Sequence, residues 1–479
     1  MKKILSLLLV LVLVFGLCAC GGSEQTQEPA QTQAPTEPAA ALQVGFGREK
    51  IMPDGPVAMS GGGDPNRIST NVKDFLYVTC VAITDAADNT VLVITQDLQS
   101  SSQSFSRTAL DQIATATGVA RENILLCATH NHSGPAQSLD RTGIAEFQAI
   151  YNASILRAAQ NAMNDRAPAT MEAGTLQADG YVFTRHYKMM DGTYAGSSYG
   201  NLVEDQIESH AYDADTTLQM IRFVREGKKP VLMMNLGAHA TFFSSTKITD
   251  LSADFPSPLR THIENNSDCL VAYFIGAAGD QTPNSKFKEY DHNLDYKAYG
   301  EAVGQLVVDG LSALQPVNAG NIKLHHMNYT AKTNKKGVER AAEAQQVYNV
   351  YLEQGYSEGN KAAYAAGFIS VYDARSILNR KKMADTDEIE LAAMSIGDVA
   401  FIYASFEMFG DSGRYIRENS PYDFTFISTL SLNAGHDYIP SDIGFELNCY
   451  EAYTAFYEQD TIKNISEVYL NTLKELKGE

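Results

Sequence analysis

The alternation of apolar and polar positions predicts a chain that mixes strands and helices. Apolar, β-branched runs at residues 75–84 and 91–95 flank a polar turn at 85–90, which indicates a hairpin. The same pattern predicts hairpins at 218–235 and 390–404 and a buried strand at 270–275. Apolar residues at helical spacing predict helices at 144–162, 299–314, 338–352 and 462–476. Because these elements alternate irregularly, we expect an α/β fold of mixed β-sheets with surrounding helices.

The first residues have the pattern of an export signal. Lys2 and Lys3 precede an apolar stretch at 4–15, which is too short to span a bilayer. Leu17 and Ala19 precede Cys20 as in a bacterial lipobox, so residues 1–19 are predicted to be a lipoprotein signal peptide and Cys20 the lipidated residue. Cleavage of a plain signal peptide nearby is the alternative. We therefore expect an extracytoplasmic protein anchored to the cell membrane through this lipid.

Composition divides the rest of the chain into a tether and one domain. Residues 20–41 are rich in Pro, Gln and Thr and contain no aromatic residue, which is typical of a disordered tether. Residues 42–479 have ample apolar content and no second linker or internal repeat, so we expect one large domain. The net charge of −20 argues against nucleic acid as a partner. The cysteines form no Cys-x-x-Cys pair, so neither a thiolate zinc site nor a dense disulfide framework is indicated.

Chemistry is concentrated at the ends of the predicted strands. The segment Thr-His-Asn-His-Ser-Gly-Pro at 129–135 follows an apolar run at 124–126. If that run is a strand, side chains alternate across it and His130 and His132 lie on one face at its end. Such a pair suits a metal ligand and a proton carrier, and two hydrogen-bonded structural histidines are the alternative. The same placement after an apolar run recurs for His239, Asp280, Glu407 and Tyr438.

In order and spacing these segments resemble the motifs of the neutral/alkaline, non-lysosomal ceramidase family of zinc amidases, here in a bacterial lipoprotein form. The matching segments are Val-Gly-Phe-Gly-Arg at 44–48, Met-Ser-Gly at 59–61, the histidine motif at 129–135, Asn235 with His239 and Thr241, Gly-Asp-Gln-Thr-Pro-Asn at 279–284, Phe-Glu-Met-Phe at 406–409, and Tyr438 with Tyr450. A metallo-β-lactamase site expects Asp-His after His-x-His, and amidohydrolase barrels expect a regular βα repeat. This sequence has neither.

The resemblance implies a single catalytic domain of the neutral ceramidase type at residues 42–479, without the family's C-terminal β-sandwich domain. It implies one Zn²⁺ per chain and cleavage of an N-acylsphingosine, or a related N-acyl lipid, into a fatty acid and a sphingoid base. Zinc hydroxide would attack the amide carbonyl. Carried over residue by residue, the zinc ligands are His130, His239, Glu407 and Tyr438.

The same resemblance assigns roles around the metal. His132 would carry a proton to the departing amine, and Tyr450 would bind substrate and stabilise the oxyanion. Arg185 would contact substrate oxygens, and Gly61 is a turn glycine that lets the backbone approach the ligand. Thr282 stands where the family has an active-site serine. Its β-branched hydroxyl favours a hydrogen-bonding role over a nucleophilic one, or else a shifted substrate.

Two alternatives to ceramide cleavage stay open. One is a zinc amidase for another N-acyl compound, and pocket apolarity would discriminate because ceramide needs a deep apolar channel. The other is a non-catalytic lipoprotein that binds ligands on the same scaffold. The segment 335–383, rich in Ala, Tyr and Gln, matches no family motif, and reshaping the pocket mouth is one role for it.

Overall fold

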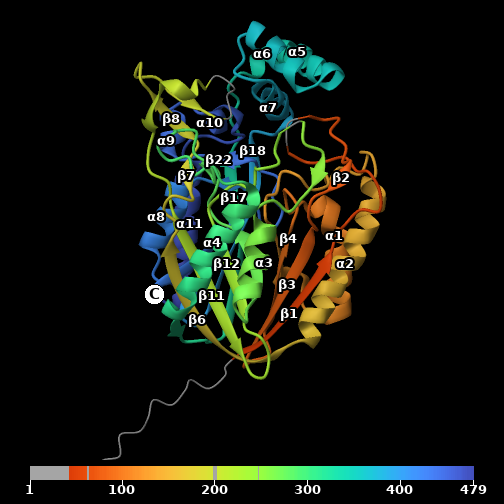
Figure 1. Ribbon diagram of the computed structural model, residues 1–479, viewed down its shortest axis with the longest axis vertical. Coiled ribbons are helices and arrows are strands. Elements are labelled where there is room, and N and C mark those ends of the chain that lie inside the picture. Colours follow the sequence, from red (N-terminus) through yellow and green to blue (C-terminus); the bar gives the residue numbers. More distant parts are fainter. Residues whose placement is uncertain (1–41, 62–63, 198–201, 246) are drawn as a thin grey trace, which may run out of the picture. The chain divides into compact units, whose positions relative to one another are not determined.

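The computed structural model describes residues 42–61, 64–197, 202–245 and 247–479 (Figure 1). The predicted signal peptide, Cys20 and the tether lie outside the described residues. The described residues belong to one compact unit. Among them, no helix combines the length and the apolarity that a bilayer span requires.

A nine-stranded mixed sheet is bent into two arms. One arm contains β1 (Leu42–Lys50), β3 (Tyr77–Asp85), β4 (Thr90–Gln96) and β5 (Ile124–Ala128). The other contains β6 (Ala167–Gln177), β11 (Thr217–Arg225), β12 (Val231–Leu236) and β14 (Leu270–Ile275), with β16 (Gln315–Val317) beside β6. The arms join where the first three residues of β1 pair with the first three of β6, and Figure 1 shows strands of both arms rising from this corner.

The two arms contact each other beyond this corner. The Thr95 hydroxyl on β4 donates to the Tyr273 carbonyl on β14 at 2.8 Å. Past the strand ends, the N–H of His132 donates to the carbonyl of Ala240 at 3.2 Å. The bend therefore brings together the loops that follow β5 and β12, although these strands are remote in the sheet order.

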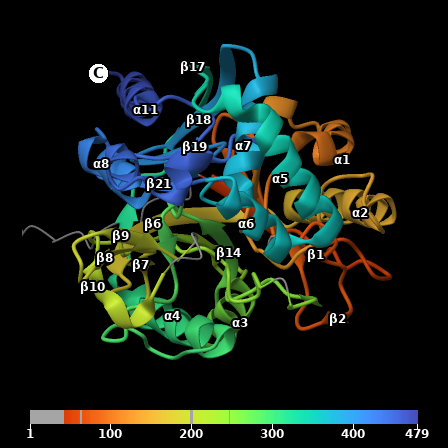
Figure 2. The same ribbon diagram turned by 90° about the horizontal axis from the view of Figure 1, so that it is seen from above.

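Helices and a second sheet cover the two faces of the bent sheet. On one face, α1 (Gln103–Thr117) and α2 (Ile144–Asn164) pack on the first arm, and α3 (Pro256–Asn266) and α4 (Tyr296–Gly310) pack on the second. On the other face lies the sheet of β17 (Ile322–Lys332), β18 (Thr386–Ile396), β19 (Val399–Ala404) and β21 (Phe424–Ser428). Its outer side is covered by α8 (Gly410–Asn419) and α11 (Thr461–Lys477) (Figure 2). The layers are therefore helix, sheet, sheet, helix.

Side-chain alternation explains the two cores on either side of the second sheet. Phe401 and Tyr403 of β19 face the bent sheet, whereas Ile402 and Ala404 face α11. Both sets are fully buried, because successive side chains of a strand point to opposite faces. A strand buried on both faces reads as a continuous apolar run, which is the pattern seen at 399–404.

The predicted α/β class with mixed sheets is confirmed. All three hairpins are present, with β3 beginning at Tyr77, and the buried strand at 270–275 is β14. The predicted helices correspond to α2, α4, α5 (Ala341–Gln354) and α11. At residues 299–314 and 338–352 the α-helices are shorter than predicted, because each adjoins a 3₁₀ turn: Leu311–Ala313 and Val338–Arg340.

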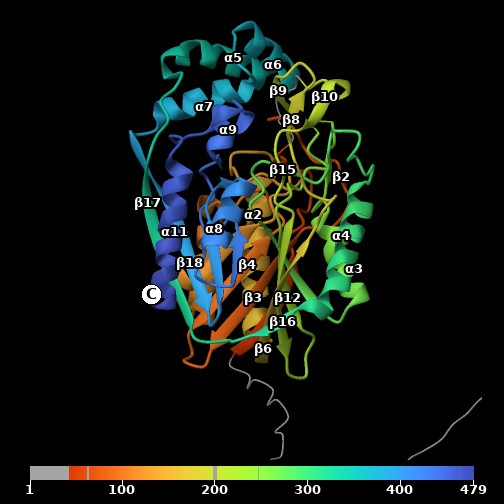
Figure 3. The same cartoon turned by 90° about the vertical axis from the view of Figure 1, so that its left-hand side faces the viewer.

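A helical cap lies over one end of the molecule. It consists of α5, α6 (Tyr356–Ala365) and α7 (Val371–Lys382), and these helices pack around a small core of their own (Figure 3). The cap is the segment that matched no family motif in the sequence. Tyr372 of α7 lies against Tyr450, with ring centroids 6.1 Å apart. The cap therefore contacts a residue of the predicted site.

Short elements complete the chain between the layers. The short strands are β2 (Asn71–Val72), β7 (Phe183–Thr184), β8 (His186–Met189), β9 (Tyr194–Gly196), β10 (Ile207–His210), β13 (Asp250–Leu251), β15 (Gln281–Thr282), β20 (Glu407–Met408) and β22 (Tyr438–Ile439). The short helices are α9 (Asp442–Glu446) and α10 (Tyr450–Thr454), with 3₁₀ turns at Arg121–Asn123 and Glu204–Gln206.

Candidate functional site

His130 and His132 meet because of a left-handed turn after β5. The strand ends at Ala128, and His130 has φ of 59°, which is uncommon for a residue with a side chain. Asn131 holds the turn: its amide donates to the Asp97 carbonyl at 2.7 Å and its Oδ1 accepts from Ser133 N at 2.7 Å. The two Nε2 atoms lie 3.1 Å apart. The predicted meeting is found, but our reason was wrong: the turn, not strand alternation, brings the imidazoles together.

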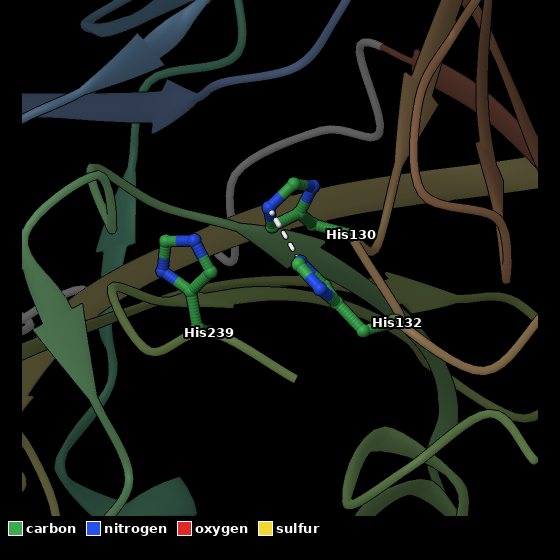
Figure 4. A group of neighbouring side chains, drawn as sticks. All are labelled: His130, His132 and His239. Atoms are coloured by element: carbon green, nitrogen blue, oxygen red, sulfur yellow. Dashed lines mark hydrogen bonds between the residues drawn. The ribbon is translucent and has the colours of Figure 1, made fainter. Parts of the chain in front are cut away.

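His130, His132 and His239 point toward one another (Figure 4). Glu407 completes this group, which we call the histidine–glutamate cluster. Glu407 Oε2 lies 3.0 Å from His239 Nε2 and 3.3 Å from His130 Nε2. His130, His239 and Glu407 are buried, and His132 is partly exposed.

Backbone carbonyls fix the orientation of two of these rings. His130 Nδ1 lies 2.8 Å from the Gln99 carbonyl, and His239 Nδ1 lies 2.6 Å from the Ala278 carbonyl. Because a carbonyl can only accept, each neutral ring carries its hydrogen on Nδ1 and turns the lone pair of Nε2 toward Glu407. Lone pairs that face a carboxylate oxygen are stabilised when a cation, either a proton or a metal ion, lies between them. The locked second nitrogen is also the usual arrangement around metal-binding histidines.

Electrostatics give the cluster the donor types that zinc prefers. Burial opposes ionisation of Glu407, but His130 and His239 outweigh it and hold the pKa of the carboxyl well below its usual range. Burial lowers the pKa of His239 to about 4, and it lowers the pKa of His132 well below the ordinary value. A carboxylate and imidazole nitrogens together form a donor set for zinc.

Tyr438 is held beside Glu407 by a short parallel strand pair. β20 pairs with β22 so that Glu407 lies opposite Tyr438, and Glu407 N donates to the Asp437 carbonyl at 2.9 Å. The rings of Tyr438 and Tyr450 are 6.0 Å apart between centroids. Burial raises the pKa of both phenols above the ordinary value, strongly so for Tyr438. The structure thus brings together all four predicted ligands and Tyr450.

Arg185 lies between this cluster and a second buried group. Its Nη2 donates to the Tyr438 hydroxyl at 3.0 Å and to the Gly279 carbonyl at 2.7 Å, and its Nη1 lies 3.5 Å from His239 Nε2. Its Nε donates to Glu451 Oε1 at 2.7 Å. Arg185 is therefore at the site as predicted, with its guanidinium bound to protein groups.

The second group, Arg185, His186, Cys449 and Glu451, is called here the arginine-bound cluster. His186, Cys449 and Glu451 bring their ligand atoms within 4.8 Å of one another, as metal ligands do. However, Glu451 Oε1 already accepts from Arg185, and Glu451 Oε2 lies 2.8 Å from His186 Nε2. Burial opposes the charge of Glu451, but Arg185 and His186 hold its pKa below the usual range. The guanidinium already neutralises the carboxylate, so this cluster does not fit a cation.

Gly61 and Thr282 lie at the edge of the site. Gly61 has φ of +68°, the turn conformation that we predicted, and a Cβ there would lie 2.5 Å from His132 Cβ. Its backbone therefore approaches His132. Thr282 lies on β15 opposite Phe183, and its hydroxyl accepts from Asn284 N at 3.4 Å. The neighbouring Gln281, rather than Thr282, contacts His239, through its carbonyl 3.1 Å from Nδ1.

Sequence reasoning missed Glu451 and treated His186 as a structural or surface residue. Glu451 is fully buried and bonds Arg185 across 266 residues of chain, a distance that no local pattern reveals. A signal was nevertheless present, because Glu451 directly follows Tyr450 and His186 directly follows Arg185. An ionisable neighbour of a predicted site residue was the clue.

Comparisons with known proteins agree with this fold. The model of the N-terminal region of neutral/alkaline non-lysosomal ceramidases matches residues 42–295. A solved ceramidase complexed with C2 is 15% identical with a TM-score of 0.66, and the match covers 92% of this chain and 76% of that one. Neutral ceramidase from Pseudomonas aeruginosa is 16% identical with a TM-score of 0.67, covering 91% of this chain and 75% of that one. These likenesses show a shared fold. A search of curated protein sequences finds no match.

Proposed function

Because the chain belongs to the neutral/alkaline non-lysosomal ceramidase family, and is thus a hydrolase of amide bonds, we propose that it is a zinc-dependent, ceramidase-like enzyme. Its proposed substrate is an N-acylsphingosine, which it would cleave into a fatty acid and a sphingoid base. One observation carries the metal requirement: two imidazoles, each fixed through Nδ1 by a backbone carbonyl, turn their Nε2 atoms toward the same Glu407 oxygen.

His130, His239, Glu407 and Tyr438 would hold one zinc ion. Zinc at such a site supplies a Lewis acid that polarises the amide carbonyl and lowers the pKa of water. Tyr438 reaches the group because β22 places it opposite Glu407. Arg185, which donates to the Tyr438 hydroxyl, orients that phenol and favours its ionised form.

His132 is proposed as the proton carrier rather than a fifth ligand. Among the described residues, no carbonyl is hydrogen-bonded to its ring, in contrast to His130 and His239. The residue is also less buried than His130 and His239. Its low pKa keeps it neutral and able to accept the proton that the departing amine then receives.

Tyr450 is proposed to stabilise the oxyanion that forms when the carbonyl is attacked. Burial raises the pKa of its phenol, so it stays protonated and can donate a hydrogen bond. Arg185 would hold Tyr438 in place through the hydrogen bond to its hydroxyl. Gly61 would let the backbone lie close against His132. Thr282, whose hydroxyl accepts a backbone N–H, is proposed to bind substrate rather than attack it.

The decisive experiment is hydrolysis of a short-chain fluorescent ceramide by residues 42–479, which hold every described element. We expect amide cleavage that a chelator abolishes and added zinc restores. Cleavage that resists the chelator would contradict the metal requirement. A folded, zinc-loaded protein that leaves ceramide intact would contradict ceramide as the substrate.

We also propose that the mature chain is held outside the cytoplasm by a lipid on Cys20. The support is the sequence Leu-Cys-Ala-Cys at 17–20 after an apolar stretch. Cell fractionation tests it: the full chain should sediment with membranes, and Cys20→Ala should not. Equal partition of both would contradict lipidation.

A further inference from the structure

A cavity of about 510 Å³ lies between the cap and the segment that leads to Tyr438. The cap supplies Gln345 and Tyr348 from α5 and Arg375 and Lys382 from α7. The other side includes Gly435 and Asp437. Asp437, which lines the cavity, directly precedes the predicted ligand Tyr438 in the chain.

Among the described residues that line this cavity, none is hydrogen-bonded to the cation of Arg375. Its Nε is buried and has no hydrogen-bond partner. Among the described residues, no hydrogen bond or ion pair engages its guanidinium, whereas Arg380 of the same helix donates to the carbonyls of Tyr453 and Ala455. The guanidinium lies over the Tyr372 ring, 5.0 Å from its centroid, which is a cation–π contact. A guanidinium held in this way presents its donors to a ligand.

A row of aromatic rings connects Arg375 to the metal-binding residues. Tyr372, under Arg375, lies 6.1 Å from Tyr450, and Tyr450 lies 6.0 Å from Tyr438 between ring centroids. A substrate whose amide lies at Tyr450 could therefore place a distal group near Arg375. Tyr372 belongs to the cap, whereas Tyr450 and Tyr438 belong to α10 and β22 outside it.

The lining of the cavity is polar and positively charged. Arg375 and Lys382 contribute two positive charges and Asp437 one negative charge, and the remaining lining residues are neutral. A net positive lining in a chain of charge −20 indicates a ligand that carries negative charge.

We propose that this cavity is a subsite for an anionic group on the substrate, a carboxylate or a phosphate, bound by Arg375. The proposal rests on the proposed amide hydrolase function. It adds that N-acyl compounds with an acidic group are cleaved in preference to neutral amides with the same acyl chain, N-acylsphingosine being one of the neutral amides. Guanidinium groups bind both anions through paired hydrogen bonds.

Three substrates that share an octanoyl chain test this. N-octanoylethanolamine is neutral, N-octanoylglycine adds a carboxylate, and N-octanoylphosphoethanolamine adds a phosphate. We expect the zinc-loaded protein to cleave one or both acidic amides with the higher kcat/KM. Arg375→Gln should lower that value about 10- to 100-fold, the effect of losing a charged hydrogen bond, and leave the neutral amide within about twofold. Lys381→Gln, exposed on the same helix, is the matched control.

A binding experiment separates this proposal from the proposed function. Octyloxyacetate and 2-octyloxyethanol contain no amide and differ in the carboxylate, so they report binding without hydrolysis. We expect octyloxyacetate to raise the melting temperature of the zinc-loaded protein and of Lys381→Gln, but not of Arg375→Gln. Stabilisation without hydrolysis of any amide would contradict the hydrolase function alone. Hydrolysis with equal kcat/KM for neutral and acidic amides would overturn the anionic subsite alone.

Discussion

Two buried clusters of histidine and glutamate lie side by side, and they differ in how the charge of the glutamate is balanced. In the histidine–glutamate cluster, Glu407 Oε2 faces the Nε2 atoms of His130 and His239. In the arginine-bound cluster, Glu451 faces His186 but also accepts from Arg185 Nε at 2.7 Å. The difference is the source of positive charge. The guanidinium of Arg185 supplies it to Glu451, whereas we propose that a bound metal ion supplies it to Glu407.

This contrast shows why distance between ligand atoms is an insufficient guide to metal sites. Both clusters bring three ligand-type atoms within 4.8 Å. What separates them is whether the lone pairs already have partners. Since Arg185 also donates to Tyr438, the second cluster positions a ligand of the first. The two clusters are therefore joined through Arg185, which is bonded to Glu451 and to Tyr438.

The largest expected effect comes from removing the unpaired carboxylate. Glu407→Gln replaces the anionic ligand by a neutral amide, so we expect zinc affinity to fall by more than about 100-fold and hydrolysis to fall to background. Metal analysis after dialysis and an amidase assay would measure both. Glu451→Gln is the matched control, because it makes the same change in the other cluster. Equal zinc loss in the two variants would contradict the assignment of zinc to the histidine–glutamate cluster alone.

His132→Ala should give the next largest effect and separate proton transfer from metal binding. We expect kcat to fall about 10²- to 10⁴-fold, as for loss of a general acid or base, while zinc stays bound. Zinc content and kcat are measured on the same preparation, with exposed His262→Ala as the control. Loss of the zinc together with activity would make His132 a ligand and contradict the assignment.

Glu451→Gln should lower stability more than it lowers metal binding. The change leaves the Arg185 guanidinium buried without its counter-charge, which costs about 3 kcal/mol of unfolding free energy. Denaturant unfolding would measure the loss, and zinc content should stay at one per chain. An unfolding free energy unchanged from wild type would show that Arg185 does not depend on Glu451.

The smallest effect concerns Asp254, a buried carboxyl outside both clusters. Burial raises its pKa to about 7 from 3.8. Between these values the folded state keeps a proton that the unfolded state has released, so stability falls as pH rises from about 4 to 7. Asp254→Asn loses one of two backbone hydrogen bonds but escapes this fall.

The melting temperature of Asp254→Asn should therefore lie below that of wild type at pH 5, and the gap should close by about 2 °C at pH 8. Melting curves at the two pH values measure the change. A gap that is the same at both would show that Asp254 does not titrate in this range.

Local patterns were sufficient for most of the elements. Apolar, β-branched runs predicted the β3–β4 and β11–β12 hairpins, because strands that are buried on both faces read as continuous apolar runs. They could not predict the bend between β1 and β6, which depends on a contact of three residue pairs between distant segments. That bend is what brings the loops of His132 and His239 together.

The site was predicted through its motifs rather than through local physics. His130 and His132 were found from their spacing, yet the left-handed φ of His130 is set by Asn131 and Asp97, which the pattern does not reveal. Glu407 and Tyr438 came from the resemblance alone, and their pairing on β20 and β22 joins segments far apart in sequence. Glu451 and Arg375 depend on tertiary neighbours, so no pattern identified their partners.

Anomalous diffraction at the zinc absorption edge, from crystals of the zinc-loaded protein, tests the central claim most directly. The account predicts one peak, within bonding distance of His130 Nε2, His239 Nε2 and Glu407. A peak between His186, Cys449 and Glu451 instead, or none at the first position in a protein that contains zinc, would contradict it.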